Sequence, residues 1–254
     1  MSQKVFVAGA SGAIGKSLVP LLLGAGYCVY GGTRRPEHAQ ALEALGATPV
    51  LLDVYDAKAL KDALVGIQPW AVVHQLTDLP RGLDPSLMAQ AVVANARIRE
   101  EGTRHLVAAA LASGATRLVA QSIAWAYQPG AKPYLESQPL DLLAEGPRRT
   151  SVRGVAALER QVLGEASLHG TVLRYGHIYG PGTGSEKPTG ASPLHVEAAA
   201  YAALLALQKS PGGIFNITED NPDVSSEKAK RELGWSPAWR LAPAAASAES
   251  AASA

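Results

Sequence analysis

Cysteine, excess charge and long apolar runs are nearly or wholly missing from this 254-residue sequence. Cys28 is the only cysteine, so no disulfide can form within the chain, and we expect a reducing compartment, the cytoplasm. A formal net charge of +1 argues against a basic surface for nucleic acid. No apolar run approaches the roughly 20 residues of a membrane span, and the first expected strand begins too early to leave room for a signal peptide.

Metal-ligand patterns are missing as well. The six histidines lie far apart, and neither Cys-x-x-Cys nor His-x-x-x-His occurs, so no metal site is predicted. Hydrophobic residues make up 47% and charged residues 18%, a balance typical of a globular chain that can bury a full core. Residues 241–254 are almost all Ala, Ser and Pro, which predicts a flexible tail.

The sequence does contain a regular alternation of short apolar segments and amphipathic segments. Strands are predicted at residues 4–8, 27–32, 48–52, 71–74, 117–121, 171–174 and 213–216. Helices are predicted at about residues 13–23, 37–45, 56–65, 88–113, 156–165, 196–208 and 226–233. This alternation predicts an α/β fold with a doubly wound parallel sheet and helices on both faces.

The first predicted strand leads into three glycines spaced G-x-x-G-x-x-G, and a helix follows at once. Such glycines let the backbone approach a pyrophosphate, and the first N–H groups of the helix point at it. The motif alone is weak evidence, but its place between the first strand and helix of an α/β series favours nucleotide binding. The expected contacts are Gly9, Ser11, Gly12, Ala13, Ile14 and Gly15.

This turn makes the doubly wound sheet a Rossmann-type dinucleotide-binding domain, which we expect over residues 1–175. Residues 176–240 are expected to form a small, reduced substrate region intertwined with it. The loops after Tyr127 carry Pro129, Pro133, Pro139 and Pro147, and we expect them to face the substrate.

The end of the second predicted strand indicates which dinucleotide is bound. NAD-binding proteins usually have an acid there for the ribose 2′-hydroxyl, whereas the NADP phosphate needs cations. This chain has Thr33, Arg34 and Arg35, which favours NADP(H) over NAD(H), unless the arginines only form a solvated helix entrance. Asp53, followed by Val54, is placed either for the adenine edge or as the cap of the next helix.

Further motifs follow in a recognisable order. They are GASGAIG (9–15), LDV (52–54), VVHQLT (72–77), GTRHLVAAA (102–110), RLVAQS (117–122), PYLES (133–137), LRYGHIYGPG (173–182), LHV (194–196) and KRELGW (230–235). With them the chain resembles the extended branch of the short-chain dehydrogenase/reductase superfamily, the NAD(P)-dependent epimerase/dehydratase type. The resemblance implies an oxidoreductase or epimerase-like enzyme for a small hydroxyl or carbonyl substrate such as a nucleotide sugar. It also places Gln75, Leu76 and Thr77 beside the cofactor.

The catalytic residues of that superfamily do not carry over. Its enzymes use a Ser or Thr four residues before the tyrosine that matches Tyr127, and Ile123 stands there. They also use a Tyr-x-x-x-Lys pair, for which the helix pattern around Glu159 leaves Ser151 and Val155. Serine has no usable pKa near neutrality and valine has no charge. Either another group transfers the proton, or no redox chemistry takes place.

Three residues are candidates for the proton transfer that the absent tyrosine would otherwise perform. Ser122 is the hydroxyl nearest to the expected serine position, and it is also a candidate cofactor contact. Tyr175 and His177 follow the sixth predicted strand, and ligands of open α/β sheets bind at such strand ends. A histidine can serve as an acid or base, so His177 is a candidate, although it could instead only orient the substrate, while Tyr175 could pack structurally. Trp125 either walls the pocket or belongs to the core.

Two functions of different classes stay open at this point. One is an atypical NADP-preferring oxidoreductase or epimerase; the other is a non-catalytic NADP(H)-binding sensor or structural protein, which the missing pair favours. The detailed substrate-end motif at residues 174–182 favours the enzyme. The segments after Gly182 and Asn221 are short for the family, because the substrate cap is reduced or because loops are absent from the sequence.

The expected partner is a small-molecule substrate, with no nucleic acid and no membrane. The resemblance also implies a homodimer through the helical segments at about 88–113 and 156–165. Their alanine-rich faces would serve a contact within one chain equally well.

Overall fold

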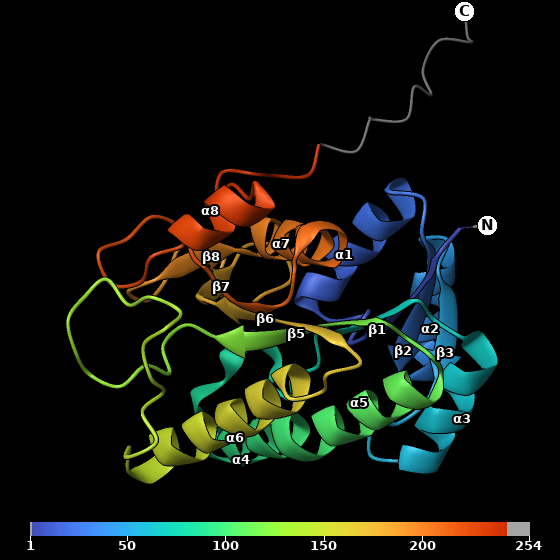
Figure 1. Ribbon diagram of the computed structural model, residues 1–254, viewed down its shortest axis with the longest axis horizontal. Helices are drawn as coiled ribbons and strands as arrows, with labels where there is room; N and C mark the ends of the chain where they lie inside the picture. Colours follow the sequence, from blue (N-terminus) through green and yellow to red (C-terminus); the bar gives the residue numbers. More distant parts are fainter. Residues whose placement is uncertain (1, 243–254) are drawn as a thin grey trace, which may run out of the picture.

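The computed structural model describes residues 2–242, apart from the side chain of Arg81 (Figure 1). Most of the tail that the sequence predicts to be flexible therefore lies outside the described residues. Seven parallel strands form the main sheet. In spatial order they are β3 (Thr48–Leu51), β2 (Cys28–Thr33), β1 (Lys4–Ala8), β4 (Ala71–His74), β5 (Arg117–Ile123), β6 (His169–Tyr175) and β9 (Gly213–Ile217). The doubly wound parallel sheet predicted from the sequence is confirmed.

Helices cover both faces of this sheet (Figure 1). One face carries α1 (Ala13–Gly24), α2 (Pro36–Ala44) and α7 (Val196–Lys209), with the short α8 (Glu227–Leu233) against α7. The other face carries α3 (Ala57–Ile67), α4 (Met88–Arg97), α5 (Thr103–Ala112) and α6 (Gly146–Leu163). No helix among these is long and apolar enough to cross a membrane.

The strands are continuous runs of apolar residues because both faces of the sheet are buried. In β1, Val5 and Val7 belong to the core on the α1 side, whereas Phe6 and Ala8 belong to the core on the α5 side. Successive side chains of a strand point to opposite faces, so each face needs its own apolar residues.

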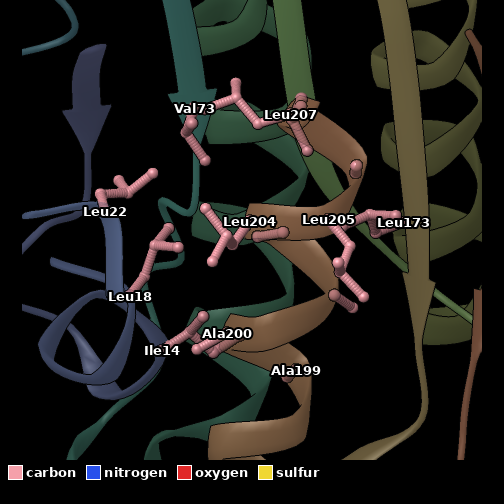
Figure 2. Packing of buried hydrophobic residues seen from close by; sticks show 14 of the residues in the cluster. Ile14, Leu18, Leu22, Val73, Leu173, Ala199, Ala200, Leu204, Leu205 and Leu207 are labelled. Carbon is pink, nitrogen blue, oxygen red and sulfur yellow. The ribbon is translucent and has the colours of Figure 1, made fainter. Parts of the chain in front are cut away.

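An aliphatic seam joins α1 to α7, as Figure 2 shows. Ile14, Leu18 and Leu22 of α1 meet Ala200 and Leu204 of α7 across it. The small alanines of α7 let the two helix backbones approach, and each buried leucine contributes about 1.5–3 kcal/mol. The seam fixes α1, and with it the glycine turn, on the sheet.

Three features differ from the sequence-based expectation. Helix α6 begins at Gly146, ten residues before the predicted start, because its first half is too polar to show helical periodicity although Pro147 stands in the favourable first turn. The helical segment at 88–113 is interrupted by a π-helical turn, η3 (Ile98–Gly102). Two short strands, β7 (His177–Tyr179) and β8 (Pro193–His195), form a separate parallel pair that three-residue patterns could not reveal.

The sheet topology decides where a ligand can bind. Strand β1 lies between β2 and β4. The strands that follow it are first added on one side of β1, as β2 and β3, and then on its other side from β4 onward. Ligands of doubly wound sheets bind at the carboxyl ends of the strands at such a point. The glycine turn follows β1 there.

Candidate functional site

The glycine turn is shaped so that side chains are excluded at two of its glycines. Gly9 has φ of +88°, and a Cβ there would lie 2.7 Å from the carbonyl oxygen of Gln75. A Cβ on Gly15 would overlap the carbonyl oxygen of Gly9. Gly12 is the N-cap of α1 and no side chain caps this helix end. The turn thus presents free N–H groups at the positive end of a helix, which fits a pyrophosphate.

Ser11 of this turn contacts a residue that sequence reasoning missed. Its Oγ lies 3.1 Å from Nδ1 of His38, in the first turn of α2. The only sequence signal for this contact is the histidine that stands three residues after Arg35. His38 thus links the turn after β1 to the helix after β2, where the cations for an NADP phosphate are expected.

The three residues at the end of β2 are placed as expected for a surface that contacts a ligand. Thr33 is buried and its Oγ1 accepts a hydrogen bond from the N–H of Arg35 at 3.2 Å. Arg34 and Arg35 are exposed, and Arg34 lies 3.9 Å from Asp78 after β4. Because both members of that pair are exposed, the contact is weak and leaves Arg34 available to a phosphate.

The end of β3 resolves one alternative left open by the sequence. The cap of α3 is Asp56, which accepts a hydrogen bond from the N–H of Ala59 at 2.9 Å. Asp53 instead accepts from the N–H of Tyr55 at 3.0 Å and is exposed, so the interpretation of Asp53 as the helix cap is wrong. The side chain of Val54 packs in the core, so only its backbone can face a ligand.

The segment after β4 lies against the glycine turn. The backbone of Gln75 lies against Gly9, and Leu76 and Thr77 follow it half-buried. Nε2 of Gln75 donates to the hydroxyl of Tyr175 at 3.4 Å, whereas its Oε1 is buried and has no hydrogen-bond partner among the described residues. An unpartnered buried acceptor beside the glycine turn fits a donor group of a bound dinucleotide.

Ser122 and Tyr175 do not lie where the sequence-based hypothesis needs them. The Ser122 hydroxyl donates to Oε1 of Glu159 at 2.8 Å, and the Tyr175 hydroxyl donates to the carbonyl oxygen of Ala199 at 3.1 Å. Both side chains are fully buried, and burial raises the pKa of Tyr175 well above its usual value. The structure gives no support to proton transfer by either residue, nor to a cofactor contact by the Ser122 hydroxyl.

His177 is the one catalytic candidate that is not fully buried. It is partly buried at the start of β7 and stacks on Trp125, with ring centroids 6.5 Å apart and planes 21° apart. Its Nδ1 has no hydrogen-bond partner within residues 2–242. Trp125 is 38% exposed, so it belongs to a wall and not to the core. The two rings form an aromatic surface just beyond the end of β5.

Apolar side chains occupy the positions of the superfamily's reactive residues. Ile123 and Val155 join Ala126 and Val152 in a small buried cluster, and Ser151 next to it is 7% exposed. This cluster contains no group that could act as an acid or base. Tyr127, at the end of the same motif, is also buried and donates to Oδ1 of Asn216 at 2.6 Å.

Two buried charges lie behind this cluster. The guanidinium of Arg174 donates to both carboxylate oxygens of Glu159, at 2.9 and 2.7 Å. Burial alone would lower the pKa of Arg174, but the hydrogen bonds and charge of Glu159 outweigh it and raise the pKa. A second buried cation, Arg99, lies nearby, and sequence reasoning missed it because nothing in the helical pattern marks it as buried.

The other histidine near the substrate end has a structural role. Nδ1 of His195 accepts a hydrogen bond from the N–H of Glu197 at 3.3 Å and thereby caps α7. Its ring meets the ring of Tyr179 edge-on. Among residues 2–242 no group of three or more His, Cys, Asp or Glu side chains could hold a metal ion.

A parallel sheet whose winding reverses beside an uncapped glycine turn defines a dinucleotide-binding protein of the doubly wound class. Comparison with known families agrees with this geometry. The chain belongs to the NAD(P)H-binding family: the family model of that description matches residues 9–195.

Similar proteins include one curated relative over almost the whole chain. A 3-diazoavenalumate denitrifying reductase from a Streptomyces species is 39% identical over 269 residues, which cover 96% of this chain and 85% of that protein. A decarboxylating sterol-4-alpha-carboxylate 3-dehydrogenase from Dictyostelium discoideum is 34% identical over a segment that covers 28% of this chain.

Solved structures share the fold at low identity. A UDP-glucose 4-epimerase from Thermotoga maritima, solved with UDP-glucose, has a TM-score of 0.73 at 18% identity, covering 93% of this chain and 94% of the epimerase. A UDP-glucose 4-epimerase from Stenotrophomonas maltophila with bound NAD also has a TM-score of 0.73, at 20% identity and 94% coverage of both chains. These solved structures show a shared fold, and the family model adds that the chain is a member of the NAD(P)H-binding family.

Proposed function

We propose that this chain is an NADPH-dependent reductase that transfers a hydride to a diazo compound with loss of dinitrogen. The observation that carries the proposal is the apolar cluster at Ile123 and Val155, with buried Ser151, where acid/base residues are expected. A reaction that needs no proton from the protein suits such a site. The Streptomyces relative is named as a denitrifying reductase of a diazo compound, which is a reaction of this kind.

The proposed reaction does not need the Tyr-x-x-x-Lys pair that this chain lacks. Reduction of a carbonyl requires a hydride on carbon and a proton on oxygen, so a positioned acid is needed. In a cationic diazo compound the carbon–nitrogen bond breaks with its electron pair leaving on dinitrogen. A carbon–hydrogen bond forms from the hydride, and NADPH is oxidised to NADP⁺. The balance closes with no proton, and the chain needs only to hold the substrate and exclude water.

The residues that hold the substrate in this proposal are Trp125 and His177. The exposed indole offers a face to a planar compound, and stacked aromatic groups contribute about 0.5–1.5 kcal/mol beyond their area. The imidazole of His177, stacked on this indole, extends the aromatic surface. A planar, electron-poor diazo compound matches both features. An epimerase, in contrast, needs a base for a sugar hydroxyl, and neither Ser151 nor Val155 is one.

NADPH is the proposed cofactor because of the cations after β2. Arg34 and Arg35 are exposed at the carboxyl end of β2, beside Ser11 and His38, and no acid stands among them to hold a ribose 2′-hydroxyl. When bound, the reduced nicotinamide supplies the hydride. A cytoplasmic location completes the proposal, since the lone Cys28 suits a reducing compartment.

The test follows the origin of the new hydrogen. The purified chain is incubated with a carboxylate-bearing arenediazonium salt and NADPH deuterated at the transferable hydrogen, and the product is analysed by mass spectrometry. We expect one deuterium in the product, none when unlabelled NADPH is used in D₂O, and no turnover above the enzyme-free rate with Gly12→Val. Turnover of carbonyl compounds only would overturn the proposal. Binding of both redox forms without turnover of any substrate would instead favour the sensor.

A further inference from the structure

A buried arginine lies in the irregular turn between α4 and α5. Arg99 is 9% exposed and belongs to η3, the π-helical turn Ile98–Gly102. Such turns insert an extra residue into a helix, redirect its side chains and are frequent at functional sites. Nothing in the core packing requires a cation at this position.

The charge of Arg99 has no partner of its own. Among the described residues its guanidinium makes no hydrogen bond and no ion pair, and burial lowers its pKa to about 10. The nearby Glu159 carboxylate already accepts hydrogen bonds from Arg174 and Ser122. Two buried arginines therefore lie near one buried glutamate, and the charge of Arg99 is compensated only where its guanidinium reaches the surface, by water or by a ligand group.

Packing between the helices shows which way this charge faces. A Cβ on Gly154 of α6 would lie 2.9 Å from Cα of Ala96, and Gln161 of α6 donates to the carbonyl oxygen of Glu100 at 3.2 Å. Arg99 lies between these two contacts, so it faces the turn of α6 from residue 155 to residue 159. Its charge also acts on His74, the last residue of β4. Arg99 is thus at the carboxyl edge of the sheet, where β4 and β5 end.

The position of the glycine turn identifies what reaches this edge. A pyrophosphate at the start of α1 lies beside β1, so the nicotinamide half of the dinucleotide extends past β4 toward β5. Of the hydrogen-bond acceptors in that half, the phosphate oxygens stay at the glycine turn and the carboxamide oxygen lies at the far end of the ring, so the ribose hydroxyl oxygens are the acceptors between them. We propose that Arg99 binds the nicotinamide ribose and supplies the cation that Val155 does not. This inference rests on the dinucleotide alone and not on the diazo substrate.

The test compares two ligands that differ in the ribose concerned. Binding of NADPH and of the adenosine bisphosphate half of NADP, which lacks the nicotinamide riboside, is measured by calorimetry for wild type, Arg99→Met and Arg99→Lys. We expect Arg99→Met to weaken NADPH binding about 10- to 100-fold and to change binding of the half-molecule less than about twofold. Arg99→Lys should recover most of the loss. Arg104→Met, at an exposed arginine of α5, is the matched control and should change neither.

Unfolding of the unliganded variants separates this role from a structural one. Because the unpaired charge is unfavourable in the fold, Arg99→Met should unfold at the same or a higher urea concentration than wild type. A less stable variant that loses both ligands equally, or one that binds NADPH as wild type does, would overturn the inference and leave the reductase standing. The expected ligand pattern without turnover of any diazo compound would overturn only the proposed function.

Discussion

Glu159 and Arg174 form a two-point ion pair in the interior, between α6 and β6, with both side chains at most 7% exposed. Such a pair adds little over an apolar pair of equal volume, but breaking it leaves a buried charge alone. We therefore expect Glu159→Gln to lower the free energy of unfolding by about 3–5 kcal/mol in urea titrations. The exposed pair Lys58–Asp62 is the control: Asp62→Asn should change it by less than about 0.5 kcal/mol.

The glycine turn predicts a contrast between two glycines. Gly9→Ala forces a side chain into a positive-φ position against the Gln75 carbonyl, and should destabilise the chain by roughly 2–4 kcal/mol while abolishing NADPH binding. Gly24→Ala, at the end of α1, meets no neighbouring atom and should be neutral or stabilise by up to about 1 kcal/mol. Equal effects of the two substitutions in thermal unfolding would contradict the close approach at Gly9.

Cofactor preference is expected to depend on the cations after β2. Replacing Arg34 and Arg35 together by alanine removes charge-assisted hydrogen bonds to a 2′-phosphate and should weaken NADPH about 10- to 100-fold. NADH, which lacks this phosphate, should bind about as before. Fluorescence titration with both cofactors measures the ratio, and Lys61→Ala on the surface of α3 serves as the charge control. An equal loss for both cofactors would show that the arginines do not read the phosphate.

His74 should make stability depend on pH. Burial, with a smaller effect of the Arg99 charge, lowers the pKa of His74 to about 4, and its Nε2 and Nδ1 contact Thr103 and the N–H of Leu76. The unfolded state binds the proton from about pH 6.5 downward, whereas the folded state does not until about pH 4, so stability falls as pH falls through this window. The contribution lost between pH 7.5 and pH 5 is about 2 kcal/mol.

Urea unfolding at several pH values tests this dependence against His74→Gln. The variant lacks the titrating ring, so its stability should fall less between pH 7.5 and pH 5, by the same roughly 2 kcal/mol. Parallel pH profiles for the two proteins would mean that His74 is protonated in the folded state as readily as in the unfolded state.

Trp125 should affect the substrate and not the cofactor. Because Trp125 is 38% exposed and the rest of it is covered, Trp125→Ala should lower the free energy of unfolding by about 1–3 kcal/mol and raise KM for a planar diazo substrate about 3- to 10-fold. Binding of NADPH should stay as in wild type. A changed NADPH affinity with an unchanged KM would place the indole at the cofactor instead.

Sequence patterns predicted those parts of the molecule whose structure depends on residues close together in the chain. The glycine turn, the strand before it and the helix after it follow from period and from backbone chemistry within fifteen residues. The order of the strands follows from the winding rule for such units. The start of α6 at Gly146 was missed because its first residues, 146–150, are polar and at least partly exposed and carry no periodic apolar signal.

The candidate site was predicted only in part, for a related reason. Partners far apart in the chain decide which side chains are free, and no spacing reveals them. Ser122 is held by Glu159, 37 residues away, and the Ser11 contact with His38 spans 27 residues. The unpaired charge of Arg99 follows from three-dimensional packing of η3 against α6. Local motifs thus predicted where a cofactor would bind, whereas the partners of reactive and charged groups needed coordinates.

The two faces of the sheet should respond differently to pH and salt, because the aliphatic seam between α1 and α7 lies on only one of them. The residues labelled in Figure 2 are all aliphatic, so neither protons nor salt ions act directly on the contact that positions the glycine turn. The opposite face carries His74, Arg99 and the Glu159–Arg174 pair, whose energies vary with pH. Changes in solution conditions should therefore alter the reactive end of the molecule first. The anchor of the dinucleotide should keep its geometry throughout.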